Sequence, residues 1–237
     1  MPSRYILQIE TATQVCSVAL SADGETIAFC DIDEPNVHAA QLTVSVEELL
    51  RASSLSFKDL AAVAVGKGPG SYTGLRIGVS TAKGLCYATD LPLIAIDTLA
   101  GMAAGFVADY TEPIAGNMRF CPMVDARRME VYAAVYGHDL QPITPAAATI
   151  VDAQSFEYLG TGEQMVLFGS GADKLAELFA DNKQVEVIPG FKNSARHLSR
   201  MADLAYQEKQ FANLAYFEPY YLKDFVATAP KQRSPSL

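Results

Sequence analysis

The feature that most constrains this chain is a glycine-rich run at residues 66–78, which reads GKGPGSYTGLRIG. The run contains five glycines and a proline, and it leads from a short apolar segment, residues 61–65, into a helix-like segment, residues 72–88. Glycine permits backbone conformations and close approaches that other residues forbid, and Pro69 fixes one φ angle. The run therefore predicts a tight strand-to-helix turn that either receives an anion or lets another backbone pack closely against it.

The same run excludes the two common nucleotide-binding fingerprints. No Gly-Lys-Ser/Thr closes it, so it is not a Walker A loop, and Thr73 stands where the last glycine of GxGxxG would be. Ser71 is the expected N-cap of the following helix. We refer below to the glycine loop, which consists of Gly68, Pro69, Gly70, Ser71 and Gly74.

The first half of the chain predicts three strands followed by alternating helices and strands, which is the order in one half of an actin-like ATPase or sugar kinase. A hairpin turn at Asp23-Gly24 joins the second and third strands. The expected strands are residues 5–9, 15–21, 26–31, 61–65 and 92–96, and the expected helices are residues 39–52, 72–88 and 98–107.

The second half repeats this order in a reduced form, and an acidic residue again stands at the end of its first strand (Asp125, as Glu10 in the first half). Its expected strands are residues 120–124, 130–136, 165–168 and 185–188, and its expected helices are residues 172–179 and 194–207. We expect an α/β fold of the actin-like ATPase and sugar kinase (ASKHA) type with two βββαβα-type halves, the second reduced.

The expected organisation is an N-terminal lobe at residues 1–110 and a C-terminal lobe at residues 111–226, whose last segment can pack back on the first lobe. Residues 227–237 are rich in Pro, Ser, Lys and Arg and are expected to form a mobile tail.

Composition limits the classes of partner. The formal charge of −9 argues against unaided nucleic-acid binding, which needs a basic surface to neutralise phosphates. The four cysteines are widely spaced, without a CxxC pair, which suits a reduced compartment. Neither a signal-peptide apolar stretch nor a run of membrane-spanning length is present, so a soluble cytoplasmic protein is expected.

The glycine-rich run resembles the Gly-Pro-Gly-Ser-Phe-Thr-Gly-Leu-Arg-Ile-Gly signature of the bacterial TsaB (YeaZ) family, with Tyr72 in the place of phenylalanine. Residues 137–213 resemble the family only loosely. Other matching pieces follow in the family's order: IETAT at 9–13, CSVAL at 16–20, His38 with Gln41-Leu42, AKGL at 82–85, DTL at 97–99, DAR at 125–127, EVY at 130–132 and PYYLK at 219–223.

This resemblance implies a non-catalytic scaffold and activator of a TsaD-type transferase, which forms N6-threonylcarbamoyladenosine at position 37 of tRNAs together with a TsaE-type ATPase. The partner would hold metal, nucleotide and tRNA, so this chain would meet tRNA only indirectly. It would have no cofactor of its own, although ATP or ADP could be shared at the interface. A homodimer is expected when the partner is absent.

The same comparison bears on metal binding and catalysis. TsaD-type relatives hold a metal with an HxxxH pair on a helix, whereas here Leu42 stands four residues after His38. No metal site is therefore expected. No HExxH or GxSxG motif supports a peptidase, and no catalytic residue is assigned.

The main alternative is an ATP-dependent phosphotransferase of the sugar-kinase type that uses Glu10 or Asp125. Glu10, Thr11 and Thr13 occupy the place of an acidic residue and phosphate turn in such enzymes, although local turn chemistry explains them better. An adenosine-binding glycine motif would also be needed, and Gly160-Thr161-Gly162 and Gly169-Ser170-Gly171 are weak candidates.

Two basic residues are candidate contacts for an interface nucleotide or anion. Lys67 lies beside the glycine loop, and Arg127 follows Asp125 at an expected tight turn, where its guanidinium could reach a carboxylate or phosphate. The competing interpretation of Arg127 is an internal ion pair with Asp125 or Glu130. The family's Asp-Ala-Arg motif favours the functional interpretation.

The helix after the glycine loop carries no charge over about 220° of its circumference, more than the ~100° stripe of a surface helix. We expect one cover to be the sheet and the other a partner helix, because the small residues of this face permit close approach. The alternative is that the chain's own second half covers it. The expected partner interface comprises Leu42, Val46, Ile77, Thr81, Gly84 and Ala88.

Overall fold

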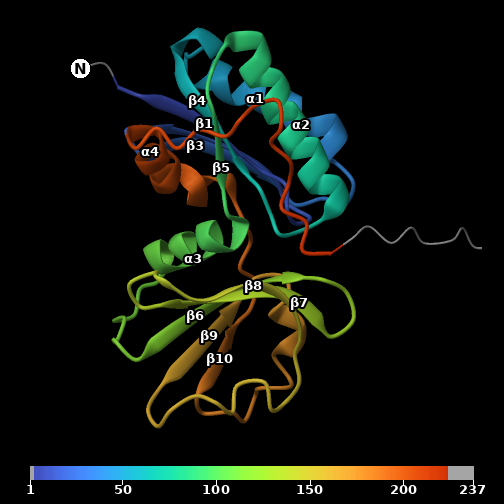
Figure 1. The fold of residues 1–237 in the computed structure, drawn as a ribbon, viewed down its shortest axis with the longest axis vertical. Helices are drawn as coiled ribbons and strands as arrows, with labels where there is room; N and C mark the ends of the chain where they lie inside the picture. Colours follow the sequence, from blue (N-terminus) through green and yellow to red (C-terminus); the bar gives the residue numbers. More distant parts are fainter. Residues whose placement is uncertain (1–2, 224–237) are drawn as a thin grey trace, which may run out of the picture.

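The computed structural model describes residues 3–223 and contains two five-stranded sheets, one formed by each half of the chain (Figure 1). The first sheet has the order β3-β2-β1-β4-β5. Its strands are β1 (Tyr5–Glu10), β2 (Cys16–Ala22), β3 (Glu25–Ile32), β4 (Leu60–Gly66) and β5 (Leu93–Ile96). Asp23 and Gly24 both have positive φ, 51° and 88°, as the predicted hairpin turn requires.

The second sheet repeats the topology of the first. In each sheet the first strand pairs antiparallel with the second and parallel with the fourth, so β6 corresponds to β1. The sheet order is β10-β9-β6-β7-β8. Its strands are β6 (Met118–Asp125), β7 (Glu130–Gly137), β8 (Pro142–Ile150), β9 (Gln164–Phe168) and β10 (Val185–Ile188). The expectation of two related halves is confirmed.

The helices are distributed unequally between the halves, as predicted for a reduced second half. The helices are α1 (His38–Ala52), α2 (Tyr72–Thr89), α3 (Thr98–Asp109) and α4 (Ser199–Gln207). Short 3-10 turns occur at Phe57–Asp59, Asp173–Leu175 and Ala195–Leu198. No helix follows β8, where the first half has α1 after β3.

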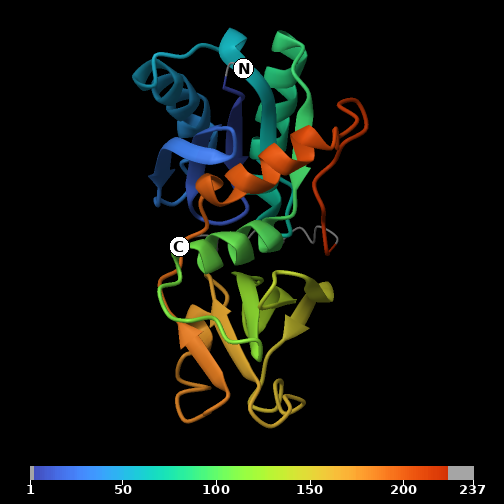
Figure 2. The same cartoon turned by 90° about the vertical axis from the view of Figure 1, so that its left-hand side faces the viewer.

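One helix of each half packs on the sheet of the other half. Helix α3 packs on β6 of the second sheet, where Leu99, Met102 and Phe106 join a core with Phe120 and Phe168. Helix α4 packs on β1 and β5 of the first sheet, opposite the face that α1 and α2 cover (Figures 1 and 2). The two halves are therefore joined by exchanged helices as well as by the connecting chain.

One expectation about the second half is wrong, and one of its strands was not placed. Residues 172–179 form only the 3-10 turn and irregular turns, because a helix of eight residues is marginal and the burial of Leu175 and Phe179 fixes single turns instead. Strand β8, the third strand of the second half, was given no residue range from the sequence, and it contains Pro142 and Pro145. It is an edge strand, where a missing backbone donor is tolerated.

The remaining segments agree with the expectations or lie outside the part described. The expected helix at 194–207 begins with the 3-10 turn at Ala195–Leu198 before α4. The tail predicted at 227–237 lies outside the described residues. Across residues 3–223, none of the helices combines the length and apolar character needed to cross a bilayer.

His197 is buried where the 3-10 turn before α4 meets α3. Its ring stacks on Phe191 with centroids 5.2 Å apart, and its Nδ1 accepts a hydrogen bond from the Ser194 amide at 3.3 Å. A Cβ added at Gly105 would come within 2.2 Å of the ring. Burial, assisted by the nearby Arg196 charge, lowers the pKa of His197 to about 4.

We predict that His197 makes the fold sensitive to mild acid. The unfolded chain takes up a proton at a pKa near 6.5, whereas the folded state resists protonation down to about pH 4. Stability is therefore lost as the pH falls through this window, by up to about 3 kcal/mol. In urea unfolding at pH 7.5, 5.5 and 4.5, the His197→Gln variant should lose less stability than the wild type. Parallel pH dependences of the two proteins would contradict this assignment.

Candidate functional site

The glycine loop packs directly on the turn between β1 and β2. The Ser71 amide donates to the carbonyl oxygen of Ala12 at 2.7 Å. A Cβ added at Gly70 would lie 2.4 Å from that oxygen, and one at Gly74 would lie 2.1 Å from the carbonyl oxygen of Thr11. No side chain fits at these positions, so the glycines are required by the contact between two backbones.

Several backbone amides in and beside the glycine loop donate hydrogen bonds inside the protein. The Gly68 amide donates to Thr98 Oγ1 at 3.1 Å, and the Lys67 amide donates to the carbonyl oxygen of Ile96 at 2.8 Å. Ser71 caps α2, as expected, by accepting from the Gly74 amide at 3.3 Å. Of the two roles left open by the sequence, the geometry supports close backbone packing rather than an anion cradle.

Glu10 lies behind this contact and faces the interior. Its Oε1 accepts from the Thr11 and Ala12 amides at 2.8 Å each, and its Oε2 accepts from Thr98 Oγ1 at 3.2 Å. Complete burial raises the pKa of Glu10, while these hydrogen bonds oppose the shift. A buried carboxylate with occupied oxygens cannot reach a substrate, so the geometry does not favour the phosphotransferase alternative.

The other features of that alternative also have structural roles. Asp125 is held in an ion pair with Lys174. Gly169 has a φ of 98°, and a Cβ added there would come within 2.5 Å of the Met123 carbonyl oxygen, which indicates close packing. His38 Nε2 hydrogen-bonds the Thr13 carbonyl oxygen at 3.1 Å. In residues 3–223 no three His, Cys, Asp or Glu side chains come together as metal ligands.

Arg127 lies in an exposed turn between β6 and β7, which we call the arginine turn (residues 125–130). Both Arg127 and Arg128 have positive φ, 73° and 51°, and neither forms an ion pair among the described residues. The neighbouring carboxylates are taken by lysines, because Asp125 pairs with Lys174 and Glu130 pairs with Lys223. The internal ion pairs considered for Arg127 are therefore absent, and its guanidinium is exposed.

A C-terminal strap (residues 213–223) runs beside α2 and reaches the glycine loop (Figure 1). Lys83 of α2 donates to the carbonyl oxygen of Phe217 at 2.9 Å, and the Tyr220 amide donates to that of Lys67 at 2.7 Å. The strap therefore covers one flank of α2, so the alternative of a cover from the chain's own second half is partly correct. Lys67 itself is half-buried and lies near Asp97. Burial raises the pKa of Asp97, and the charge of Lys67 opposes part of this shift.

The opposite flank of α2 stays open. Gly84 and Ala88 are exposed there, a Cβ added at Gly84 would meet nothing within 4 Å, and Ile77 and Thr81 are half-buried. Tyr87 lies at the edge of this flank and is 85% exposed. We call Ile77, Thr81, Gly84, Tyr87 and Ala88 the α2 face.

The interface expected at Leu42 and Val46 needs correction. Both side chains are only 1% exposed and pack in the core of the first sheet, so they cannot contact a partner. The helical pattern identified the core-facing stripe of α1 rather than its outer surface. That outer surface includes Glu47 and Glu48, so the uncharged open surface belongs to α2.

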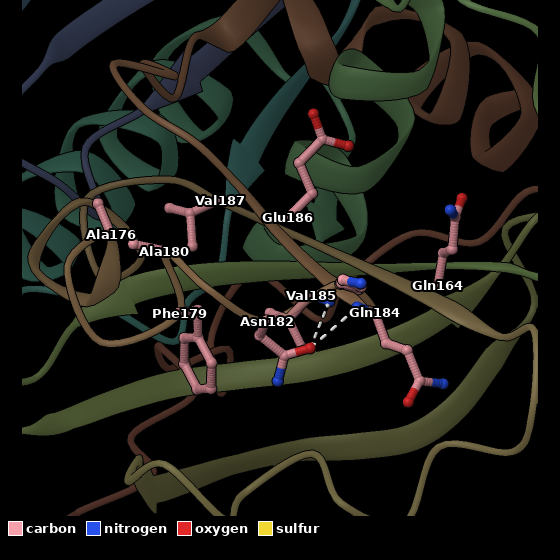
Figure 3. Close-up of a pocket in the computed structure, with 10 residues that line it drawn as sticks. Gln164, Ala176, Phe179, Ala180, Asn182, Gln184, Val185, Glu186 and Val187 are labelled. Carbon is pink, nitrogen blue, oxygen red and sulfur yellow. Dashed lines mark hydrogen bonds between the residues drawn. The ribbon is translucent and has the colours of Figure 1, made fainter.

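A pocket in the described structure lies away from these residues. It has a volume of about 410 Å³ and is bordered by edge strand β10 and residues 176–184 (Figure 3). The Asn182 Oδ1 at its floor accepts from the Gln184 and Val185 amides. None of the predicted site residues lines this pocket.

Sequence reasoning missed the contacts of Lys174 and Lys223, although it expected the last segment of the C-terminal lobe to pack back on the first lobe, as the strap does. Lys223 belongs to the PYYLK segment at 219–223, which gave a signal for the family without indicating a contact. Lys174 gave no signal, because its contact with Asp125 spans 49 residues of chain.

Comparisons with known proteins agree on one family. A family model described as "TsaD: tRNA N6-adenosine threonylcarbamoyltransferase" matches residues 35–232. The tRNA threonylcarbamoyladenosine biosynthesis protein TsaB of Bacillus subtilis is 30% identical over 92% of this chain and 93% of the relative. TsaB of Escherichia coli is 41% identical over 56% of this chain, and this match spans only 55% of the E. coli protein.

Solved structures support the fold expectation. YeaZ from Pseudomonas aeruginosa has a TM-score of 0.78 at 24% identity, over 92% of this chain and all of that one. An inorganic polyphosphate/ATP-glucomannokinase from Arthrobacter has a TM-score of 0.51 at 10% identity, over 86% of this chain and 99% of that one. The predicted actin-like ATPase and sugar-kinase architecture is thereby confirmed.

We predict opposite effects for two glycine-to-alanine substitutions in α2. Gly74→Ala places a Cβ against the Thr11 carbonyl oxygen and should destabilise the protein by about 1–3 kcal/mol. Gly84→Ala, the matched control, adds a methyl group in open space and should stabilise it by up to about 1 kcal/mol. Urea unfolding measures both effects. Equal effects of the two substitutions would contradict the role of the glycine loop.

Proposed function

Since the chain belongs to the TsaB (YeaZ) family, we propose that it is a non-catalytic subunit in the formation of N6-threonylcarbamoyladenosine at position 37 of tRNAs. Its partner is a TsaD-type transferase. The observation that carries this proposal is the α2 face, an exposed and uncharged surface of a helix whose inner side packs on the first sheet and which the strap contacts at Lys83.

The chemistry of the described residues supports a role without catalysis. Glu10 is buried against backbone amides, and Asp125 is paired with Lys174. The thiols of Cys16, Cys86 and Cys121 are buried, and burial raises the pKa of each.

The α2 face suits packing against a helix. Gly84, Ala88 and Thr81 are small, so the backbone of a partner helix can approach closely, and Tyr87 offers a large aromatic side chain at the edge. We propose that the TsaD-type subunit occupies this face. The same face can pair with its symmetry-related copy when the transferase is absent.

The arginine turn is the proposed contact for an anion at this interface. The exposed guanidinium of Arg127 can bind a phosphate or carboxylate through two parallel hydrogen bonds. We propose that it contacts the partner or a phosphate of ATP or ADP shared with the partner. With a net charge of −9, the chain itself would meet tRNA only through the complex, in which a TsaE-type ATPase also acts in the cytoplasm.

A charge placed on the α2 face should disrupt the complex. Gly84→Glu should weaken association with the TsaD-type subunit at least about tenfold, because a carboxylate would be buried without a partner. Gly116→Glu is the matched control, since it adds the same charge at another glycine with open space around it. Size-exclusion chromatography and calorimetric titration measure association, and thermal unfolding checks the fold. Unchanged affinity of Gly84→Glu would exclude this face as the interface.

Loss of the Arg127 guanidinium should lower activity without affecting the fold. Arg127→Ala should reduce threonylcarbamoyl transfer to tRNA about tenfold or more in a system reconstituted with the transferase and the ATPase, because a charge-assisted hydrogen bond is lost. Arg119→Ala is the control, since Arg119 pairs with Glu163 within the second half. If Arg127→Ala has the wild-type rate, the turn does not contact the anion.

A further inference from the structure

We propose that Lys223 is a positioning residue for the arginine turn, because it connects the turn to the glycine loop through the strap. Together with Lys174, it also keeps the neighbouring carboxylates from pairing with the guanidiniums of Arg127 and Arg128. The mechanical part of this inference stands on the isolated chain. Its functional part rests on the proposed role of Arg127.

The first step concerns competition for carboxylates within the turn. Asp125 and Glu130 lie within three residues of Arg127, and an arginine pairs readily with a carboxylate through two hydrogen bonds. Both carboxylates are instead occupied by ammonium groups from distant parts of the chain, since Lys174 follows Asp125 by 49 residues and Lys223 follows Glu130 by 93. The lysines thereby remove the internal partners that would hold the guanidiniums against the protein.

The second step concerns the conformation of the turn. Arg127 and Arg128 both have left-handed backbone conformations, which are unfavourable for residues with a Cβ and persist only where the surroundings hold them. The Ala126 amide donates to the Glu130 carbonyl oxygen at 3.1 Å, and Lys174 Nζ donates to the same oxygen at 2.7 Å. The turn is thus held at Glu130, the residue whose side chain Lys223 binds.

The third step connects the turn to the first half of the chain. The Tyr220 amide is bonded to the Lys67 carbonyl oxygen, and the ring of Tyr221 lies 4.9 Å from that of Tyr72 at the start of α2. Lys223 follows Tyr220 by three positions, a reach of at most about 10 Å. The end of the strap therefore joins the glycine loop and the arginine turn, and Figure 1 shows it descending beside α2 toward the second sheet.

The magnitude of the effect follows from exposure. The side chains of Lys223 and Glu130 are 47% and 21% exposed, so solvent weakens their attraction. An ion pair of this kind shifts a local opening equilibrium by up to about fivefold. The ion pair is thus strong enough to change how often the arginine turn opens, and too weak to determine whether the protein folds.

Hydrogen exchange of the isolated chain tests the mechanical part. In Lys223→Met the amides of Ala126 and Glu130 should exchange two- to fivefold faster than in the wild type, and Lys223→Arg should restore the slower rate. The matched control is Arg119→Met, which removes the ion pair with Glu163 and should leave these amides unchanged. Wild-type exchange of both amides in Lys223→Met would overturn the inference. The double variant Lys223→Glu/Glu130→Lys should recover the slower exchange, and failure to do so would also count against the ion pair.

Transfer activity in the reconstituted system tests the functional part. Lys223→Met should lower the rate two- to fivefold at unchanged thermal stability, and Lys223→Arg should recover it. If Arg127→Ala lowers activity while Lys223→Met loosens the turn without affecting the rate, the positioning role is wrong although the proposed function stands. If neither substitution affects the rate while the turn loosens, the mechanical inference stands and the proposed role of Arg127 fails.

Discussion

The structure depends on the contact between the start of α2 and the turn after β1. Gly70 and Gly74 bring their backbone against Ala12 and Thr11 at distances that no side chain would allow. This contact uses the Ser71 amide and encloses Glu10, whose carboxylate is bound by the turn amides. It also fixes the direction in which α2 leaves the sheet. An architecture shared with sugar kinases thus has a closed turn at this position, and the open surfaces lie outside it.

Those open surfaces are arranged around the C-terminal strap. The strap covers one flank of α2 and leaves the α2 face exposed, and its end reaches the arginine turn of the second half. The face is uncharged and combines small residues with Ile77 and Tyr87, whereas the turn is cationic in a chain with an excess of acidic residues. A partner that packs a helix on the first surface and presents an oxyanion near the second would use both.

The sequence predicted most of the fold because its strongest patterns are local. The glycine-rich run, the Asp23-Gly24 turn and the apolar periodicities placed nine of the ten strands and α1 to α3. It failed where long-range packing decides the structure, as at residues 172–179 and at edge strand β8. At the site, Ser71 was predictable from local chemistry, whereas for Arg127 the family's Asp-Ala-Arg motif was needed to favour exposure over an internal ion pair. Helical periodicity could not tell the core stripe of α1 from a partner surface, because Leu42 and Val46 suit both. The pairs of Lys174 and Lys223 join residues far apart in sequence, so no local pattern revealed them.

The exchange of α3 and α4 has a consequence for how the chain acquires its structure. The face of the first sheet that Leu198 and Ala202 cover stays bare until the last part of the chain has been synthesised, although all five strands of that sheet are complete by residue 96. The contacts that finish the N-terminal core are therefore among the most distant in sequence, and such contacts form late because the entropy of closing a long loop must be overcome first. The halves resemble each other as modules, but this interlocking makes them a single cooperative unit. A chain cut between α3 and β6 would expose apolar surface on both pieces.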